Sequence, residues 1–169
     1  MKNDISNALI ESLLKEEFGD RIRGVEESYG MMDVIVKREA IVEIISWLKL
    51  HPLLKFNFLT DLCGAHFPEN KNEELAVIYH LHSFENNVRV RLHIFFPSND
   101  PKVKTLTGVF SSANWMERET FDFYGIDFEG HPDQRRILNV EDMTDFPLRK
   151  DFPLEDQTRE DKDDSMFGR

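Results

Sequence analysis

The feature that most constrains this chain is a stretch near its C-terminal end that is apolar, charged and aperiodic at once. Residues 115–138 read WMERETFDFYGIDFEGHPDQRRIL, and residues 146–154 read FPLRKDFPL. A core element would show a helical or strand period and a surface loop would be polar, and this stretch is neither. Three prolines within it also exclude long helices and central strands. We therefore predict a C-terminal arm, residues 125–154, that lies against another surface through its aromatic and Arg side chains.

The residues before this arm carry the periodic patterns of ordinary helices and strands. Helical spacing, with Asp4 as an N-cap and Gly19 and Gly125 after two helix ends, predicts helices over residues 5–18, 38–49 and 111–124. Alternation predicts strands over residues 22–28, 31–37, 54–60, 75–81 and 88–94. This order indicates an α+β domain over residues 1–124. We expect an antiparallel or mixed sheet of about five strands with helices packed on it, followed by the extended C-terminal arm.

The last two predicted strands form a hairpin. The Asn86-Asn87 pair suits the centre of a tight turn, because Asn tolerates positive φ. That turn centre predicts a register in which His82 lies opposite Arg91 and His80 lies opposite His93.

Charge and cysteine content exclude several classes of function. The chain has 169 residues and a formal net charge of −11, so the phosphate backbone of nucleic acid is a poor partner. The single cysteine, Cys63, excludes an internal disulfide and an iron–sulfur cluster built from this chain's own thiolates. No apolar run reaches the roughly 20 residues of a membrane helix, and no secretory signal is recognisable, so we expect membrane association only through partners. Residues 155–169 are expected to be an acidic mobile tail that can be removed without loss of assembly.

Three histidines invite a catalytic interpretation. His80, His82 and His93 have the residue type and strand spacing of zinc ligands. The cation of Arg91 beside them is unfavourable for a metal, so we favour an ordinary polar face of the sheet.

Three carboxylates close in sequence are a second candidate. Glu117, Glu119 and Asp122 have the residue type of a general acid–base group. Arg118 between them and the Arg135-Arg136 pair favour structural ion pairing instead. The chain has no glycine-rich phosphate-binding loop, so we expect it to bind neither NADH nor flavin by itself.

The C-terminal residues also resemble a known family. The residues that carry the resemblance are ERE at 117–119, Asp122, Gly125, Ile126, Phe128, GHPD at 130–133, RRIL at 135–138 and PLRKDFP at 147–153. They are similar to the signature of the C subunits of the proton-translocating NADH:quinone oxidoreductase, respiratory complex I. Gln134 stands where the family usually has Leu, and residues 143–146 also depart from the family pattern.

The resemblance implies a cofactor-free peripheral structural subunit on the cytoplasmic side of the cell inner membrane. The complex would transfer electrons from NADH through FMN and iron–sulfur centres, held by partner subunits, to quinone, and couple this to proton translocation. The implied partners are the subunit that resembles the hydrogenase large chain and the iron–sulfur subunits, and this chain alone is not expected to be catalytic. Two alternatives remain: the equivalent subunit of a membrane-bound hydrogenase complex, and a stand-alone metal-dependent enzyme that uses His80, His82 and His93.

The matched residues are the expected partner interface. They are Glu117, Arg118, Glu119, Asp122, Gly125, Ile126, His131, Pro132, Asp133, Arg135, Arg136, Leu138, Pro147, Arg149, Lys150, Asp151, Phe152 and Pro153. In this interpretation the Arg135-Arg136 and Arg149-Lys150 pairs are largely buried between the chain and its partner. Replacement of Arg136 or Arg149 by Ala would then leave the melting temperature of the free domain nearly unchanged and deplete the assembled complex.

Overall fold

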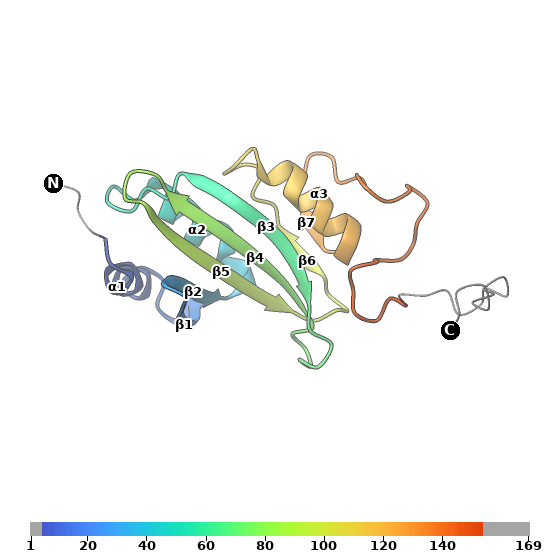
Figure 1. Cartoon of the computed structure of the whole chain (residues 1–169), viewed down its shortest axis with the longest axis horizontal. Coiled ribbons are helices and arrows are strands. Elements are labelled where there is room, and N and C mark those ends of the chain that lie inside the picture. The colour runs from blue at the N-terminus through green and yellow to red at the C-terminus, as the bar shows by residue number, and fades with distance from the viewer. Residues whose placement is uncertain (1–4, 154–169) are drawn as a thin grey trace, which may run out of the picture.

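The computed structural model describes residues 5–153. Its helices and strands are, in order, α1 (Asn7–Phe18), β1 (Ile22–Ser28), β2 (Met31–Val36), α2 (Ile41–Leu50), β3 (Phe58–His66), β4 (Leu75–Ser83), β5 (Val88–Phe96), β6 (Lys102–Lys104), α3 (Ala113–Tyr124) and β7 (Asp127–Glu129), with short 3-10 helices at Gly19–Arg21 and Arg38–Ala40. Five strands form one sheet in the order β1-β2-β5-β4-β3 (Figure 1). The β2–β5 pair is parallel and the other neighbours are antiparallel, so the predicted α+β fold with a mixed sheet is confirmed.

The helix ends follow local chemistry. The Ser6 side chain accepts a hydrogen bond from the Leu9 backbone N–H and so caps α1, whereas the predicted cap Asp4 lies outside the described residues. Gly19 follows the end of α1 with φ 49°, and Gly125 follows the end of α3 with φ 68°, both in the region that favours glycine. Both predicted C-terminal glycines are therefore confirmed.

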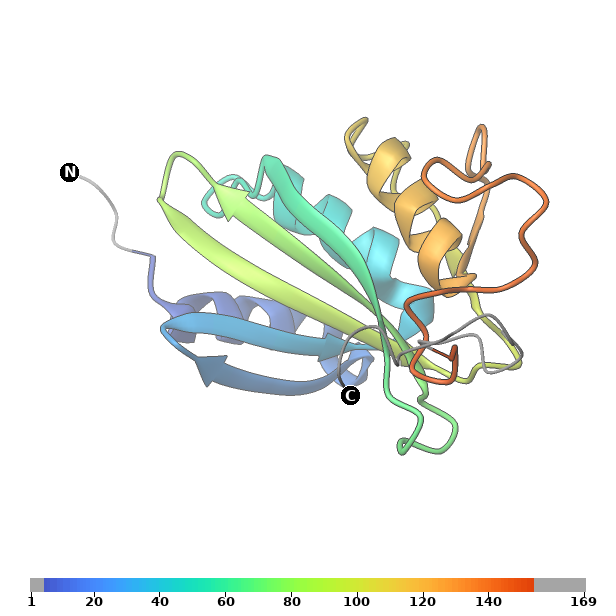
Figure 2. The ribbon, with the colours of Figure 1, turned by 45° about the vertical axis from the view of Figure 1, so that its right-hand side comes forward.

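One face of the sheet carries the hydrophobic core. Alternate residues of β2, β4 and β5 are buried on this face together with the apolar side of α2. Phe18 of α1 meets Trp47 of α2 with ring centroids 5.5 Å apart, so both helices lie on the same side of the sheet (Figures 1 and 2). Helix α3 packs beside β3, where a Cβ at Gly64 would lie 2.5 Å from Tyr124 Cδ2. Only glycine therefore allows this close approach of α3 to the strand.

The strand predicted over residues 54–60 was correct only in its last three residues, because β3 begins at Phe58 and runs to His66. The apolar residues Leu54 and Phe56 alternate with polar ones in the sequence because both are buried in the core after α2, and not because they lie in a strand. Their segment is held by turn hydrogen bonds, of which the Phe56 N–H donates to the Leu48 carbonyl at 3.1 Å.

The predicted register of the β4–β5 hairpin was also wrong, by two residues. Ser83 faces Val88, so the turn contains four residues, and the predicted partners His80 and His82 lie opposite Arg91 and Arg89. Asn86 lies in this longer turn, and its side chain binds the segment after α2: Nδ2 donates to the backbone carbonyls of residues 53 and 54 at 2.8 and 2.9 Å. A slip of two residues keeps every side chain on its predicted face.

The small sheet of β6 and β7 was not predicted. These two strands pair in parallel, with Val103 opposite Phe128. After β7 the described chain consists of turns and bends up to Pro153, and the predicted acidic tail, residues 155–169, lies outside the described residues. Within residues 5–153, no helix has the length and apolar character needed to cross a membrane.

Candidate functional site

The residues of the predicted interface gather where α3 meets the C-terminal arm. Helix α3 and the arm lie side by side in both views (Figures 1 and 2). Five of the predicted residues are buried, namely Glu117, Arg118, Asp122, Gly125 and Ile126. Five more are half-buried, namely His131, Arg136, Pro147, Arg149 and Phe152. The remaining eight are exposed, namely Glu119, Pro132, Asp133, Arg135, Leu138, Lys150, Asp151 and Pro153.

Asp122 is the centre of the contacts between α3 and the arm. Its Oδ2 accepts hydrogen bonds from three successive backbone N–H groups, at 3.1 Å from Ile137, 2.8 Å from Leu138 and 3.0 Å from Asn139. Its Oδ1 accepts from Arg136 Nη1 at 2.8 Å, and the two side chains are 0% and 7% exposed. Burial alone would raise the pKa of Asp122, but the hydrogen bonds from the arm outweigh it and hold that pKa well below its ordinary range.

The arm also supplies the hydrogen-bond donors that the C-terminal end of α3 lacks. Arg136 Nη1 donates to the Asp122 carbonyl at 2.7 Å, and Arg149 Nε donates to the Tyr124 carbonyl at 2.7 Å. The Leu148 N–H donates to the Phe123 carbonyl at 3.3 Å. The last carbonyls of a helix have no partner within it, and cations stabilise this negative end.

Arg136, Arg149 and Phe146 stack on one another where the arm contacts the end of α3. The guanidinium carbons of Arg136 and Arg149 lie 5.2 and 4.8 Å from the centroid of the Phe146 ring. The ring covers Gly125 so closely that an added Cβ there would overlap Phe146 Cε2.

These contacts correct one prediction about the arm. The Arg136 side chain is buried against Asp122 of the same chain, and Arg149 is bound to α3. Arg135 pairs with Asp133 at the surface, and Lys150 is exposed. The Arg136 guanidinium, at 7% exposure, is therefore not available to a partner's carboxylates, and replacement of Arg136 is expected to destabilise the free domain after all. Of Arg149, only the Nε is bound to α3.

Arg118 and Gln134 fasten the first part of the arm. Arg118 Nε donates to the Arg135 carbonyl at 3.0 Å, while its guanidinium lies 4.9 Å from the ring of Trp115. Gln134, which departs from the family pattern, accepts from the Phe128 N–H at 2.8 Å. It also donates to Asp127 Oδ1 at 3.1 Å, which Leu could not do.

Glu117 is the other buried carboxylate of α3, and its surroundings differ from those of Asp122. It is 0% exposed and accepts hydrogen bonds from Thr105 Oγ1 at 2.5 Å and from the Leu106 N–H at 2.6 Å. Its described contacts include no cation, and burial raises its pKa from 4.5 to about 7. Burial raises the pKa of Tyr79, and the charge on Glu117 adds to this rise. Through its hydrogen bonds to Thr105 and Leu106, Glu117 connects α3 to the turn before it.

This pKa predicts a pH dependence of stability. A raised pKa in the folded state means that the group contributes stability fully below pH 4.5 and loses it as pH rises through about 7. Between about pH 6 and 8 the free energy of unfolding should fall by about 1 kcal/mol more in the wild-type chain than in Glu117→Gln. Urea unfolding of both proteins across this range measures the difference. Glu119→Gln, at an exposed position of the same helix, is the control, and parallel curves for all three proteins would contradict the assignment.

The structure brings several residues into this site that the sequence did not indicate. They are Thr105, Leu106 and His66, whose Nδ1 accepts from the Lys150 N–H at 3.0 Å. Each contacts α3 or the arm across a long separation in sequence, so no local pattern marks them. The histidine site is not supported, because residues 5–153 contain no group of three or more His, Cys, Asp or Glu side chains placed to hold a metal ion.

Comparisons with known proteins agree with the resemblance. Residues 34–158 match the family described as respiratory-chain NADH dehydrogenase, 30 Kd subunit. The C 2 subunit of NADH-quinone oxidoreductase from Rhizobium etli (strain CIAT 652) is 46% identical over 83% of this chain and 74% of its own length. The C subunit of NADH-quinone oxidoreductase from Roseiflexus sp. (strain RS-1) is 42% identical over 89% of this chain and 86% of its own length.

Two solved structures are also similar. The trypsin-resistant fragment of Nqo5 has a TM-score of 0.64 and 33% identity, over 73% of this chain and 98% of the fragment. A chain of the membrane-bound sulfane sulfur reductase, described as an archaeal respiratory membrane complex, has a TM-score of 0.73 over 86% of this chain and 84% of that chain. At 21% identity this second likeness shows the fold alone. The family match and the identities over most of the chain show that this protein belongs to the family of the 30 Kd subunit of respiratory-chain NADH dehydrogenase.

Proposed function

We propose that this chain is a cofactor-free peripheral structural subunit of an NADH:quinone oxidoreductase. The complex would carry electrons from NADH through FMN and iron–sulfur clusters in partner subunits to quinone, coupled to proton translocation. The partners would be the hydrogenase-large-chain-like subunit and the iron–sulfur subunits. They would hold the chain on the cytoplasmic side of the inner membrane.

The interlocked helix and arm support this role. The two buried carboxylates, Glu117 and Asp122, bind groups of this chain, as expected of structural residues and not of a free acid–base pair. The outer surface of the same unit leaves large apolar side chains exposed, namely Trp115 at 63%, Leu138 at 65%, Val140 at 67% and Leu148 at 51%. Of these, Trp is among the residues enriched at the centre of protein interfaces.

The test is assembly of the complex with variants of this outer surface. Trp115→Ala and Leu138→Ser should leave the melting temperature of the purified chain unchanged within about 2 °C, because both side chains are mostly exposed. Both should lower the amount of complex in the membrane, while NADH–quinone turnover per assembled complex stays constant. Normal assembly with a collapse of turnover would instead indicate a direct catalytic role.

A further prediction concerns cofactors. The purified chain should bind no flavin, iron or zinc, since one cysteine cannot supply the usual four thiolates and the sequence has no glycine-rich nucleotide loop. Absorbance spectra and metal analysis of untagged protein measure this. Stoichiometric zinc that is lost in His80→Ala would favour the stand-alone metal enzyme.

The equivalent subunit of another membrane complex, such as a membrane-bound hydrogenase, is the second candidate. The fold recurs in a chain of the sulfane sulfur reductase, a complex that is not named for NADH, so the fold does not specify the electron donor. Purification of the intact complex and assay of its electron donor separate the two: oxidation of NADH by a co-purifying flavoprotein supports the first candidate.

A further inference from the structure

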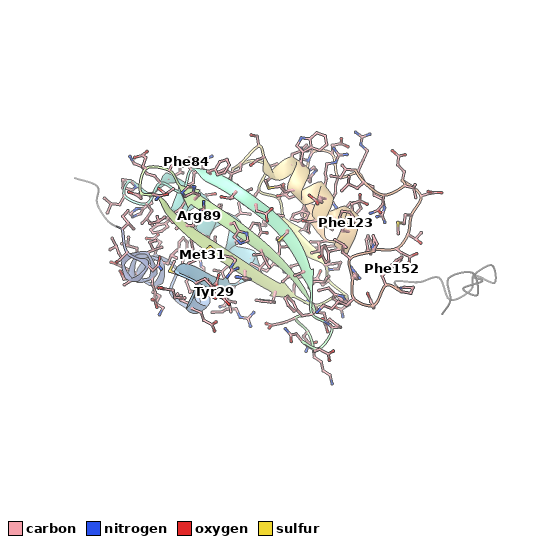
Figure 3. The ribbon with its side chains drawn as sticks, in the orientation of Figure 1. Tyr29, Met31, Phe84, Arg89, Phe123 and Phe152 are labelled. Atoms are coloured by element: carbon pink, nitrogen blue, oxygen red, sulfur yellow. The ribbon has the colours of Figure 1, made fainter. Side chains whose placement is uncertain are left out.

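The last described part of the arm is attached to the main sheet through a histidine. His66 is the final residue of β3, and its Nδ1 accepts a hydrogen bond from the Lys150 backbone N–H at 3.0 Å. Figures 2 and 3 show the end of the arm, where Phe152 is labelled, beside this end of the strand. The His66 side chain is only 5% exposed, so this contact is shielded from water. It joins two residues that are 84 positions apart in the sequence.

The contact exists only while the His66 ring is neutral. A backbone N–H can only donate, so Nδ1 of His66 has to supply a lone pair. A proton on Nδ1 occupies that lone pair and sets two N–H groups against each other. Histidine is the side chain that ordinarily changes its charge between about pH 5 and 8. The attachment of the arm at His66 therefore depends on a group that titrates near neutral pH.

His51 makes the same kind of contact, but within its own turn. Its Nδ1 accepts from the backbone N–H groups of Leu53 and Leu54, both at 3.3 Å. Protonation of His51 changes this turn alone, whereas protonation of His66 separates two distant segments of the chain. His51 is therefore the matched comparison for His66.

Two carboxylates near the His66 ring favour its charged form. Asp151 of the arm has its Oδ1 3.9 Å from Nδ1. Glu74 precedes Leu75, the β4 residue that lies opposite His66. Hydrogen bonds from backbone N–H groups, that of Asn72 first, lower the pKa of Glu74, and the charge of His66 adds to this effect.

Burial and the cations of the arm oppose a charge on the ring. The Lys150 ammonium lies 5.8 Å from the ring centroid of Phe67, and Arg149 precedes it in the arm. Tyr124 of α3, packed against β3 at Gly64, is uncharged because burial raises its pKa. The remaining charged residues of the loop after β3 are exposed or paired, namely Glu69, Lys71 and Glu73. Acids and cations thus oppose each other, and the folded chain admits both forms of the ring.

We propose that His66 makes the attachment of the arm dependent on pH: the neutral ring holds residues 150–153 against β3, and the protonated ring releases them. A proton from the solvent binds Nδ1, and the Asp151 carboxylate then attracts the ring in place of the Lys150 N–H. Arg149 stays bound to α3, so the release is confined to the end of the arm. Residues 150–153 belong to the expected partner interface, so pH would change the surface offered there. That consequence rests on the proposed function, whereas the release itself does not.

Hydrogen exchange of the Lys150 amide, measured by NMR on the purified full chain, tests the release. Its protection, relative to the intrinsic exchange rate at each pH, should fall about tenfold between about pH 8 and 5, the factor that one hydrogen bond contributes. In His66→Gln the side-chain oxygen can still accept and does not titrate, so the protection should change less than about twofold. His51→Gln should behave as the wild type does, because its contacts lie in another turn.

A second measurement needs no variant. In the wild-type chain the NMR titrations of the His66 ring and of the Lys150 amide should share one midpoint. Different midpoints, constant protection across this pH range, or an equal loss in His66→Gln overturns the inference. Failure of the chain to co-purify with any complex would instead overturn the proposed function and leave this result unaffected.

Discussion

Replacement of Asp122 by Ala should cost about 3–5 kcal/mol of unfolding free energy, the usual result of removing one member of a buried ion pair. The loss would leave Arg136 without its carboxylate and three backbone N–H groups of the arm without an acceptor. Urea unfolding of the purified chain measures it. Arg136→Ala should cost a similar amount, because it leaves the Asp122 charge buried without its cation.

Asp133→Ala is the matched control for this experiment. Asp133 also pairs with an arginine of the arm, but its side chain and that of Arg135 are 46% and 67% exposed. Exposed pairs contribute about 0–1 kcal/mol. Equal small losses for Asp122→Ala and Asp133→Ala would show that the arm is not held by Asp122.

The pH dependence of the Asp122 effect has the opposite sign to that of Glu117. The pKa of Asp122 is depressed in the folded state, so its contribution is complete above the ordinary value of 3.8 and decreases as pH falls toward the folded pKa. The difference between wild type and Asp122→Ala should therefore shrink only in strong acid.

Replacement of Gly125 by Ala should cost about 2–4 kcal/mol of unfolding free energy, because positive φ and overpacking act together. Gly125 has φ 68°, and its new methyl group would overlap the Phe146 ring. The ring cannot move aside freely, because Arg136 and Arg149 both stack on it. Denaturant unfolding of the purified chain gives the value.

Gly30→Ala is the control, since Gly30 has φ 75° and no atom lies within 4 Å of the position that the new methyl group would occupy. This variant should be destabilised only by positive φ, by about 1 kcal/mol of unfolding free energy. In a Phe146→Ala background, the destabilisation by Gly125→Ala should decrease to the same small value. If it stays as damaging there, the close contact with Phe146 is not the cause.

Elements whose signal is local could be predicted from the sequence. The helical period was enough for α2, and glycine at a helix end was enough for the C-terminal end of α3 at Gly125. Alternation assigned the two faces of β4 and β5 even though the register was wrong by two residues, since a slip of two keeps the faces. Helix and strand order was enough for the α+β fold with a mixed sheet.

Contacts between distant residues decided the rest. The hairpin register depends on Asn86 binding the carbonyls at 53 and 54, and the start of β3 depends on how the chain leaves α2. Glu117 and Asp122 look alike in the motif, yet burial without a cation raises the pKa of one, and donors from the arm lower that of the other. The sequence marked both carboxylates and the dibasic pairs as a site. The folded chain was needed to show that Arg136 and Arg149 bind α3 of the same chain, because a local pattern carries no information about which residues a distant segment will meet.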